Sequence, residues 1–235
     1  MALPRPTRPE YSTTIPSTWK KIKYSPFTVK EEKVLILAAE GGDEDEITNA
    51  VINILKACIN TPADIDIESL ALFDIEYLFL KTRAKSAGEK VTVMVTDPDD
   101  ETYSTPTEIF IDKIGVKKTE GHTTIIDISE DMKLKMRYPD ITFFTSGIDV
   151  SNFQSSIEII GKCVSSIIVD DEVINRTDME EGEIEDWLEG LTREQFSKIT
   201  KFFETMPKLE HKVSLHNPKT DKDFSITLRG LADFF

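Results

Sequence analysis

The pattern of apolar and polar positions divides the chain into a helical part, a β part and a mixed C-terminal part. Residues 27–89 show the spacing of three to four residues that is typical of amphipathic helices, and residues 90–150 alternate as antiparallel strands do. Residues 151–235 return to helical spacing and finish with another alternating stretch. We therefore expect an α+β fold with an N-terminal helical segment, a central antiparallel β-meander, and C-terminal helices followed by a β-hairpin.

Three helices are predicted in the helical part. The first begins with a capping box formed by Thr28 and Glu31 and stops at a pair of glycines. The second covers about residues 43–59 and has one apolar face. The third covers about residues 67–87 and is apolar nearly all round, which indicates a helix in the middle of a core.

Four alternating stretches predict the strands of the meander. Their apolar positions are Val91, Val93, Val95, Ile109, Ile111, Ile126, Ile128, Leu134 and Met136. Beyond them we expect a short helix near residues 152–162, a strand near residues 164–169 and two helices, the second starting with a capping box at Thr192. The apolar positions of the final hairpin are Val213, Leu215, Phe224, Ile226 and Leu228.

Residues 1–26 contain five of the eleven prolines and show no sustained periodicity. Because proline lacks an amide hydrogen, we expect an extended arm here, while residues 27–235 are long enough to form one compact domain. The arm is basic, since the first 30 residues carry six basic side chains and one acid. By contrast, residues 170–189 hold ten acids and one base. This acidic segment is either a solvated loop or a docking surface.

The overall charge and the apolar runs exclude several kinds of partner. A net charge of −15 argues against nucleic acid, because binding to phosphates requires many cationic contacts. The longest apolar run, residues 34–39, is far shorter than the roughly 20 residues of a membrane span. Cys58 and Cys163 each lie in an apolar stretch, which favours buried thiols over a disulfide. We therefore expect no membrane and no nucleic-acid partner.

No combination of residues indicates an active site. Of the three histidines, His211 and His216 are five apart in a strand pattern and point to opposite faces, so they do not suit a metal. The acidic stretch at residues 97–101 lacks the glycine of a calcium loop and predicts a hairpin turn. Ser17 and Lys20 have S-x-x-K spacing without its partner motifs. Abundant carboxylates leave a glycosidase-type pair open, but we expect no catalytic residue, metal or cofactor.

Aromatic residues favour a role in protein binding. Thirteen phenylalanines and two tryptophans exceed what a small core needs, and the chain ends on two phenylalanines. Terminal aromatics either fold back into the core or contact a partner. The candidate contact residues are Trp19, Phe27, Leu231, Phe234 and Phe235.

Three blocks of the sequence, at residues 24–38, 72–89 and 228–235, resemble the baseplate protein family of T-even-type contractile-tailed phages. The resemblance implies a hub-assembly chaperone in the cytoplasm of an infected bacterium, with tail, baseplate hub or tape-measure proteins as partners, and an oligomer is compatible with it. The alternatives are a permanent subunit of the virion baseplate and a tail-associated lytic enzyme. Some members of the family carry cysteine pairs in the final hairpin that resemble a zinc knuckle. Residues 209–223 contain no cysteine, so we expect no structural zinc.

Overall fold

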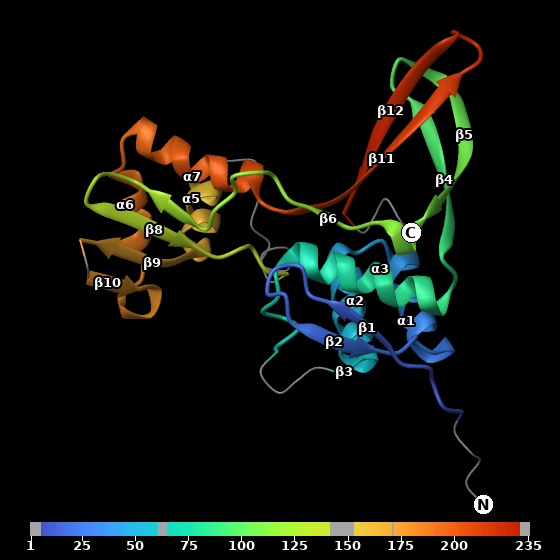
Figure 1. Ribbon diagram of the computed structural model, residues 1–235, viewed down its shortest axis with the longest axis horizontal. Coiled ribbons are helices and arrows are strands. Elements are labelled where there is room, and N and C mark those ends of the chain that lie inside the picture. Colours follow the sequence, from blue (N-terminus) through green and yellow to red (C-terminus); the bar gives the residue numbers. More distant parts are fainter. Residues whose placement is uncertain (1–5, 61–64, 142–152, 171, 231–235) are drawn as a thin grey trace, which may run out of the picture. The chain divides into compact units, whose positions relative to one another are not determined.

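The chain forms two compact units (Figure 1). Each unit has its own cluster of buried hydrophobic side chains. Unit 1 lies within residues 1–117 and 208–235, and unit 2 within residues 118–207. Both combine helices with antiparallel sheets, which confirms the α+β class. The computed structural model describes residues 6–60, 65–141, 153–170 and 172–230.

Part of the segment that we expected to be an extended arm is folded into unit 1. Strands β1 (Tyr11–Thr14) and β2 (Lys21–Tyr24) pair with each other, and β2 also pairs with β3 (Ile59–Asn60). The reason is that the prolines flank the two longer strands without interrupting them, so the hydrogen-bond ladder stays intact. Ile22 and Tyr24 are buried on one face of this sheet.

Helices α1 (Val29–Gly41) and α2 (Glu44–Cys58) follow, joined by a connection of two residues. The predicted capping box is confirmed, because the Glu31 carboxylate accepts a hydrogen bond from the Thr28 amide at 2.8 Å. Gly42 ends α1 with φ of 70°, a left-handed conformation that costs glycine little. The Asp43 carboxylate then caps α2 by accepting from the next free amides.

Helix α3 (Leu72–Ser86) lies at the centre of unit 1, as its apolar sequence predicts. Nine of its fifteen residues are buried, and they include the polar side chains of Asp74, Glu76 and Thr82. The helix begins five residues later than we expected, because residues 67–71 form turns in its place.

Two hairpins pack beside each other in unit 1 (Figure 1). One consists of β4 (Lys90–Asp97) and β5 (Asp100–Phe110), and the other of β11 (Lys208–Asn217) and β12 (Lys222–Arg229). The second confirms the predicted C-terminal hairpin, with Val213 opposite Ile226 and Leu215 opposite Phe224. Near their tips, the Asn217 amide donates a hydrogen bond of 2.8 Å to Asp97. At their bases both hairpins contribute to one core with α3.

The strands of the expected meander belong to two different sheets. After β5, the short 3-10 helix η1 (Ile111–Lys113) and β6 (Val116–Lys117) carry the chain out of unit 1. Ile111 and Ile114 are buried there, so this segment cannot form a tight turn back into a hairpin. The chain returns at β11, which pairs with β6.

Unit 2 contains an antiparallel sheet in the order β10-β9-β8-β7. Its strands are β7 (Ile125–Asp127), β8 (Met132–Met136), β9 (Val164–Val169) and β10 (Glu172–Asn175). The predicted strand near residues 164–169 is therefore confirmed as β9. The strand β10 lies at one edge of the sheet.

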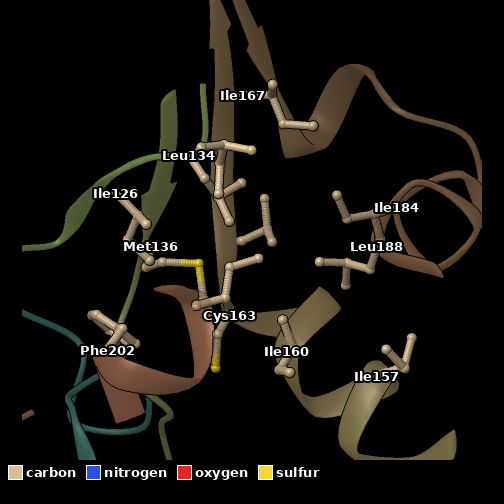
Figure 2. Close-up of a cluster of buried hydrophobic side chains, with 13 residues drawn as sticks. Ile126, Leu134, Met136, Ile157, Ile160, Cys163, Ile167, Ile184, Leu188 and Phe202 are labelled. Carbon is tan, nitrogen blue, oxygen red and sulfur yellow. The ribbon is translucent and has the colours of Figure 1, made fainter. Parts of the chain in front are cut away.

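The helices of unit 2 are α5 (Phe153–Cys163), α6 (Glu183–Glu189) and α7 (Arg193–Thr205), with the 3-10 helix η2 (Arg176–Asp178) after β10. The capping box predicted at Thr192 is confirmed at the start of α7. Side chains from α5, α6 and α7 and from β7, β8 and β9 gather in one cluster (Figure 2). Its labelled residues are Ile126, Leu134, Met136, Ile157, Ile160, Cys163, Ile167, Ile184, Leu188 and Phe202.

Two smaller expectations concern the membrane and the cysteines. None of the described helices combines the length and the apolar character that crossing a membrane requires. Cys58 and Cys163 are both buried free thiols, as predicted.

Candidate functional site

The first helix of unit 1, α1, exposes several apolar side chains to solvent. Leu35 and Ala38 pack into the unit, whereas Val34 and Leu37 point away from its core. Leu37 is 56% exposed. Apolar side chains that a stable fold leaves in water are typical of sites at which another molecule binds.

The exposed side chains border a groove between α1 and α2. Two adjoining hollows, of about 170 and 340 Å³, share Val34 and Asn53, so we treat them as one feature and call it the α1–α2 surface. Its lining residues are Lys30, Glu31, Val34, Leu37, Ala38, Glu46, Asn49, Ala50, Asn53, Ile54 and Ala57. Because the connection between the helices is so short, α1 and α2 run back along each other and hold the groove walls together.

Not every exposed apolar residue of α1 belongs to this surface. Val29 and Ile36 are seven residues apart and therefore lie two turns apart on another face of the helix. Ile36 is 51% exposed, close to the value for Leu37, but it does not line the hollows. The pair Ile36 and Leu37 thus offers matched positions on and off the α1–α2 surface.

Charge is distributed unevenly around the α1–α2 surface. Residues 29–58 carry seven acids and three lysines, a net charge of −4. Glu40 at the end of α1 and Asp45 and Glu46 at the start of α2 lie at the same end of the helix pair. No ion pair with another described residue engages these three carboxylates. This end is therefore an acidic edge that remains available to a basic partner.

Glu31 lies at the other end of the groove and is held in its ionised form. The hydrogen bonds from the Thr28 hydroxyl and amide lower the pKa of its carboxyl group below the ordinary value. Lys30 lies next to it and also lines the groove. This end consequently combines one positive and one negative charge and is not uniformly acidic.

The structure separates the residues that we proposed as contacts. Trp19 is 71% exposed in the connection between β1 and β2, where its φ of 59° holds it in a left-handed conformation. Phe27 is buried, and its amide donates a hydrogen bond to Ser86 in α3. Because it is part of the core of unit 1, we no longer propose Phe27 as a contact. Leu231, Phe234 and Phe235 lie outside the described residues.

Ser17 is better ordered than a serine in a free arm would be. Its amide donates a hydrogen bond of 2.9 Å to Asp74, and its hydroxyl donates to the same carboxylate. Asp74 is fully buried in the first turn of α3, where the helix dipole favours a negative charge. Ser17 therefore anchors the β1–β2 connection, a structural role that does not require the S-x-x-K pattern.

Two of the three histidines, His122 and His216, make structural contacts. His122 lies within 3.0 Å of both Thr205 and Tyr138 and contacts the ring of Phe202, and burial lowers the pKa of its imidazole. His216 pairs with Asp223 across the C-terminal hairpin at 2.9 Å. Among the described residues, no group of three or more histidine, cysteine or acidic side chains could hold a metal ion.

The other groups considered for catalysis also have structural surroundings. Burial raises the pKa of the Cys58 thiol to about 11 and that of the Cys163 thiol to about 12, so neither is a ready nucleophile. Asp97 and Asp100 flank the turn of the β4–β5 hairpin, as predicted for this acidic stretch. The hollows of the α1–α2 surface and the one on the β11–β12 hairpin are each lined by a single carboxylate, namely Glu31, Glu46 or Asp223. None of these hollows presents the carboxylate pair of a glycosidase.

The acidic segment at residues 170–189 is largely folded. It contributes β10, η2 and α6 to unit 2, and Ile184 and Leu188 of α6 enter the core. On β10, Val173 and Ile174 are exposed beside these acids. Only the stretches between these elements can therefore be solvated loops. The use of the segment as a docking surface stays a prediction.

The α1–α2 surface was not among the contact residues predicted from the sequence. The run at residues 34–39 gave a signal, since it is apolar on more faces of a helix than one neighbour can cover. The sequence does not reveal which of these faces is covered, because the same apolar residue types occur on buried and on exposed faces of the helix. Only the packing of α1 against α2 distinguishes Leu35 from Leu37.

One known protein family matches nearly the whole chain. Residues 8–235 match the family model described as T4 bacteriophage base plate protein. No match was found among curated proteins or among solved structures. Because the family model covers nearly the whole sequence, the chain belongs to the family of T4 bacteriophage base plate proteins.

Proposed function

We propose that the chain is an assembly chaperone of the contractile tail, which binds a baseplate hub or tape-measure protein in the cytoplasm of the infected bacterium. The observation that carries this proposal is the α1–α2 surface. It presents exposed apolar side chains, Val34 and Leu37, beside an acidic edge. Membership of the baseplate family supplies the setting, and the exposed groove supplies a means of holding a partner.

A chaperone must offer apolar contact and yet remain in solution by itself. The net charge of −15 keeps copies of the chain apart through mutual repulsion, which compensates for the exposed apolar residues. The same charge disfavours nucleic acid as a partner. We further propose that Trp19 and the terminal residues Leu231, Phe234 and Phe235 add contacts to the partner.

The alternative is a permanent subunit of the virion baseplate. Its main support is an extended basic arm that would order only on a neighbouring subunit. Residues 11–14 and 21–24 are instead paired in β1 and β2, and the connection between them is anchored through Ser17 to Asp74, which leaves less free chain for such a role. A lytic enzyme is a weaker alternative still, since the hollows described above lack paired carboxylates.

The chaperone proposal predicts that the chain keeps a partner soluble. Each hub and tape-measure protein of the same phage would be produced in bacteria with and without the chain, and its soluble fraction measured. We expect at least one of them to become soluble and to elute with the chain in size-exclusion chromatography. If none gains solubility, the proposed function is wrong.

Leu37→Glu and Ile36→Glu are matched variants for the same experiment. They place the same charge at neighbouring, similarly exposed positions of α1, and only Leu37 lines the groove. We expect the Leu37→Glu variant to lose most of its ability to keep the partner protein soluble, and the Ile36→Glu variant to retain it. If both variants keep the partner protein soluble, the chaperone activity belongs to another surface.

A further inference from the structure

We infer that the α1–α2 surface receives an amphipathic helix of its protein partner, with the basic end of that helix over Glu40, Asp45 and Glu46. The inference rests on the proposed function, since it specifies what the chaperone holds. It follows from the chemistry of the groove lining, from the dimensions of the groove and from the position of its charges.

The lining of the groove favours a helix over an extended peptide. Both walls are helices, whose backbone groups already bond within each helix. An extended peptide would bring unpaired amides and carbonyls onto apolar side chains, where Asn49 and Asn53 are the only amide side chains of the lining. The charged lining residues, Lys30, Glu31 and Glu46, lie at the two ends of the groove. A helix satisfies its own backbone and presents only side chains, so it can enter such a groove without this cost.

The dimensions of the groove indicate the length of the occupant. Helix α1 has 13 residues and is therefore about 20 Å long at 1.5 Å per residue. A helix of three to four turns would follow it from one hollow to the other. Apolar side chains at positions i, i+3 or i+4, and i+7 of that helix would meet Val34 and Leu37 and enter the two hollows.

The charges give the occupant a polarity. Glu40, Asp45 and Glu46 gather at one end of the helix pair, while Lys30 and Glu31 share the other. Lysine or arginine in one terminal turn of the partner helix would therefore interact favourably with the acidic end of the groove. The same side chains would find no such net attraction at the other end. A second copy of the chain is a poorer occupant, because residues 29–58 carry a net charge of −4 in each copy and two such helix pairs repel each other.

The test uses three fluorescently labelled 18-residue peptides with leucine at helical spacing on an alanine-rich background. The first carries lysine and arginine in one terminal turn, the second carries glutamate at those positions, and the third contains two central prolines that break the helix. Binding to the full chain is measured by fluorescence anisotropy at low and at high salt. The variants Leu37→Glu, Ile36→Glu and Glu46→Lys are measured in parallel.

We expect the basic peptide to bind and the proline peptide not to bind. Leu37→Glu should weaken binding about tenfold or more, corresponding to roughly 1.4 kcal/mol, and Ile36→Glu less than about twofold. Glu46→Lys should weaken binding of the basic peptide severalfold at low salt. The preference of the natural chain for the basic over the acidic peptide should become smaller as salt screens the charges.

Three results would overturn the inference. They are no binding of the basic peptide up to about 1 mM, equal binding of the proline peptide, and equal losses in Leu37→Glu and Ile36→Glu. A dimer in sedimentation analysis that Leu37→Glu abolishes, without peptide binding, would identify a second copy as the occupant. If the peptides fail but co-production still keeps a tail protein soluble, the chaperone stands and only the helical occupant is wrong.

Discussion

Replacing Asn217 with aspartate is expected to lower the free energy of unfolding of unit 1 by about 3 kcal/mol at pH 7. Asn217 is fully buried, and its side-chain amide donates hydrogen bonds to Asp97 at 2.8 Å and to Asp100 at 3.3 Å. The replacement has the same shape, but it removes the donor and places a third carboxylate against two others. Asp97 is itself 2% exposed, so water cannot relieve the repulsion.

The loss should become smaller as the pH falls, because a protonated carboxyl group can donate to Asp97 again. Urea unfolding at pH 7 and pH 4.5, with hydrogen exchange of residues 90–110 and 208–229 as the local readout, measures both effects. Asn60→Asp is the matched control, since Asn60 donates to Glu10 at 3.0 Å in an exposed position. A loss at Asn217 no greater than that at Asn60 would show that the link between the hairpins contributes little.

Glu76→Gln is expected to stabilise unit 1 by up to about 3 kcal/mol above pH 7. Glu76 is buried in α3, and the desolvation of its carboxylate raises its pKa to about 7. In the unfolded chain the pKa is near the ordinary value of 4.5. Between these two values the unfolded chain releases a proton that the folded chain retains, so the stability of the natural protein falls as the pH rises from about 4.5 to about 7.

Glutamine remains neutral at every pH, so the variant should lose this dependence and match the natural protein at about pH 4.5 and below. Urea unfolding at half-unit steps from pH 4.5 to pH 8.5 measures the difference. Glu89→Gln is the control, because Glu89 is exposed and its pKa is lowered by a hydrogen bond from Lys85. Parallel curves for Glu76→Gln and the natural protein would contradict the account of a buried, poorly solvated carboxylate.

Local signals predicted the ends of several elements well. The capping boxes at Thr28 and Thr192 mark the starts of α1 and α7, and the alternation around Val213 gives the register of the last hairpin. These features depend on interactions between residues close in sequence, such as a side chain and an amide three positions away. The sequence therefore contains most of what determines them.

Features that depend on distant contacts were harder to predict. The short strand β1 is stable because it pairs with β2 and because Ser17 reaches Asp74, 57 positions along the chain. Periodicity over four residues cannot indicate such a strand, and the neighbouring prolines suggested an open arm. Likewise, β5 and β7 both alternate in the same way, and nothing in that alternation says that they belong to different sheets.

The interaction site illustrates the same limit at the level of single residues. The sequence directed attention to aromatic residues, yet Phe27 is buried, while the aliphatic Leu37 is exposed. Helical spacing alone assigns residues to faces, but tertiary packing decides which faces another element covers. That decision requires the position of α2 against α1, which no local pattern contains.

The composition of finished phage particles tests the central claim, that this baseplate family member is an assembly chaperone, most directly. Quantitative mass spectrometry would compare purified particles with unassembled complexes from the same infected cells, using another baseplate protein as the internal reference. We predict that the chain is bound to a hub or tape-measure protein in the unassembled fraction and absent from finished particles. A constant ratio of the chain to the reference protein in finished particles would contradict the chaperone and identify a permanent subunit.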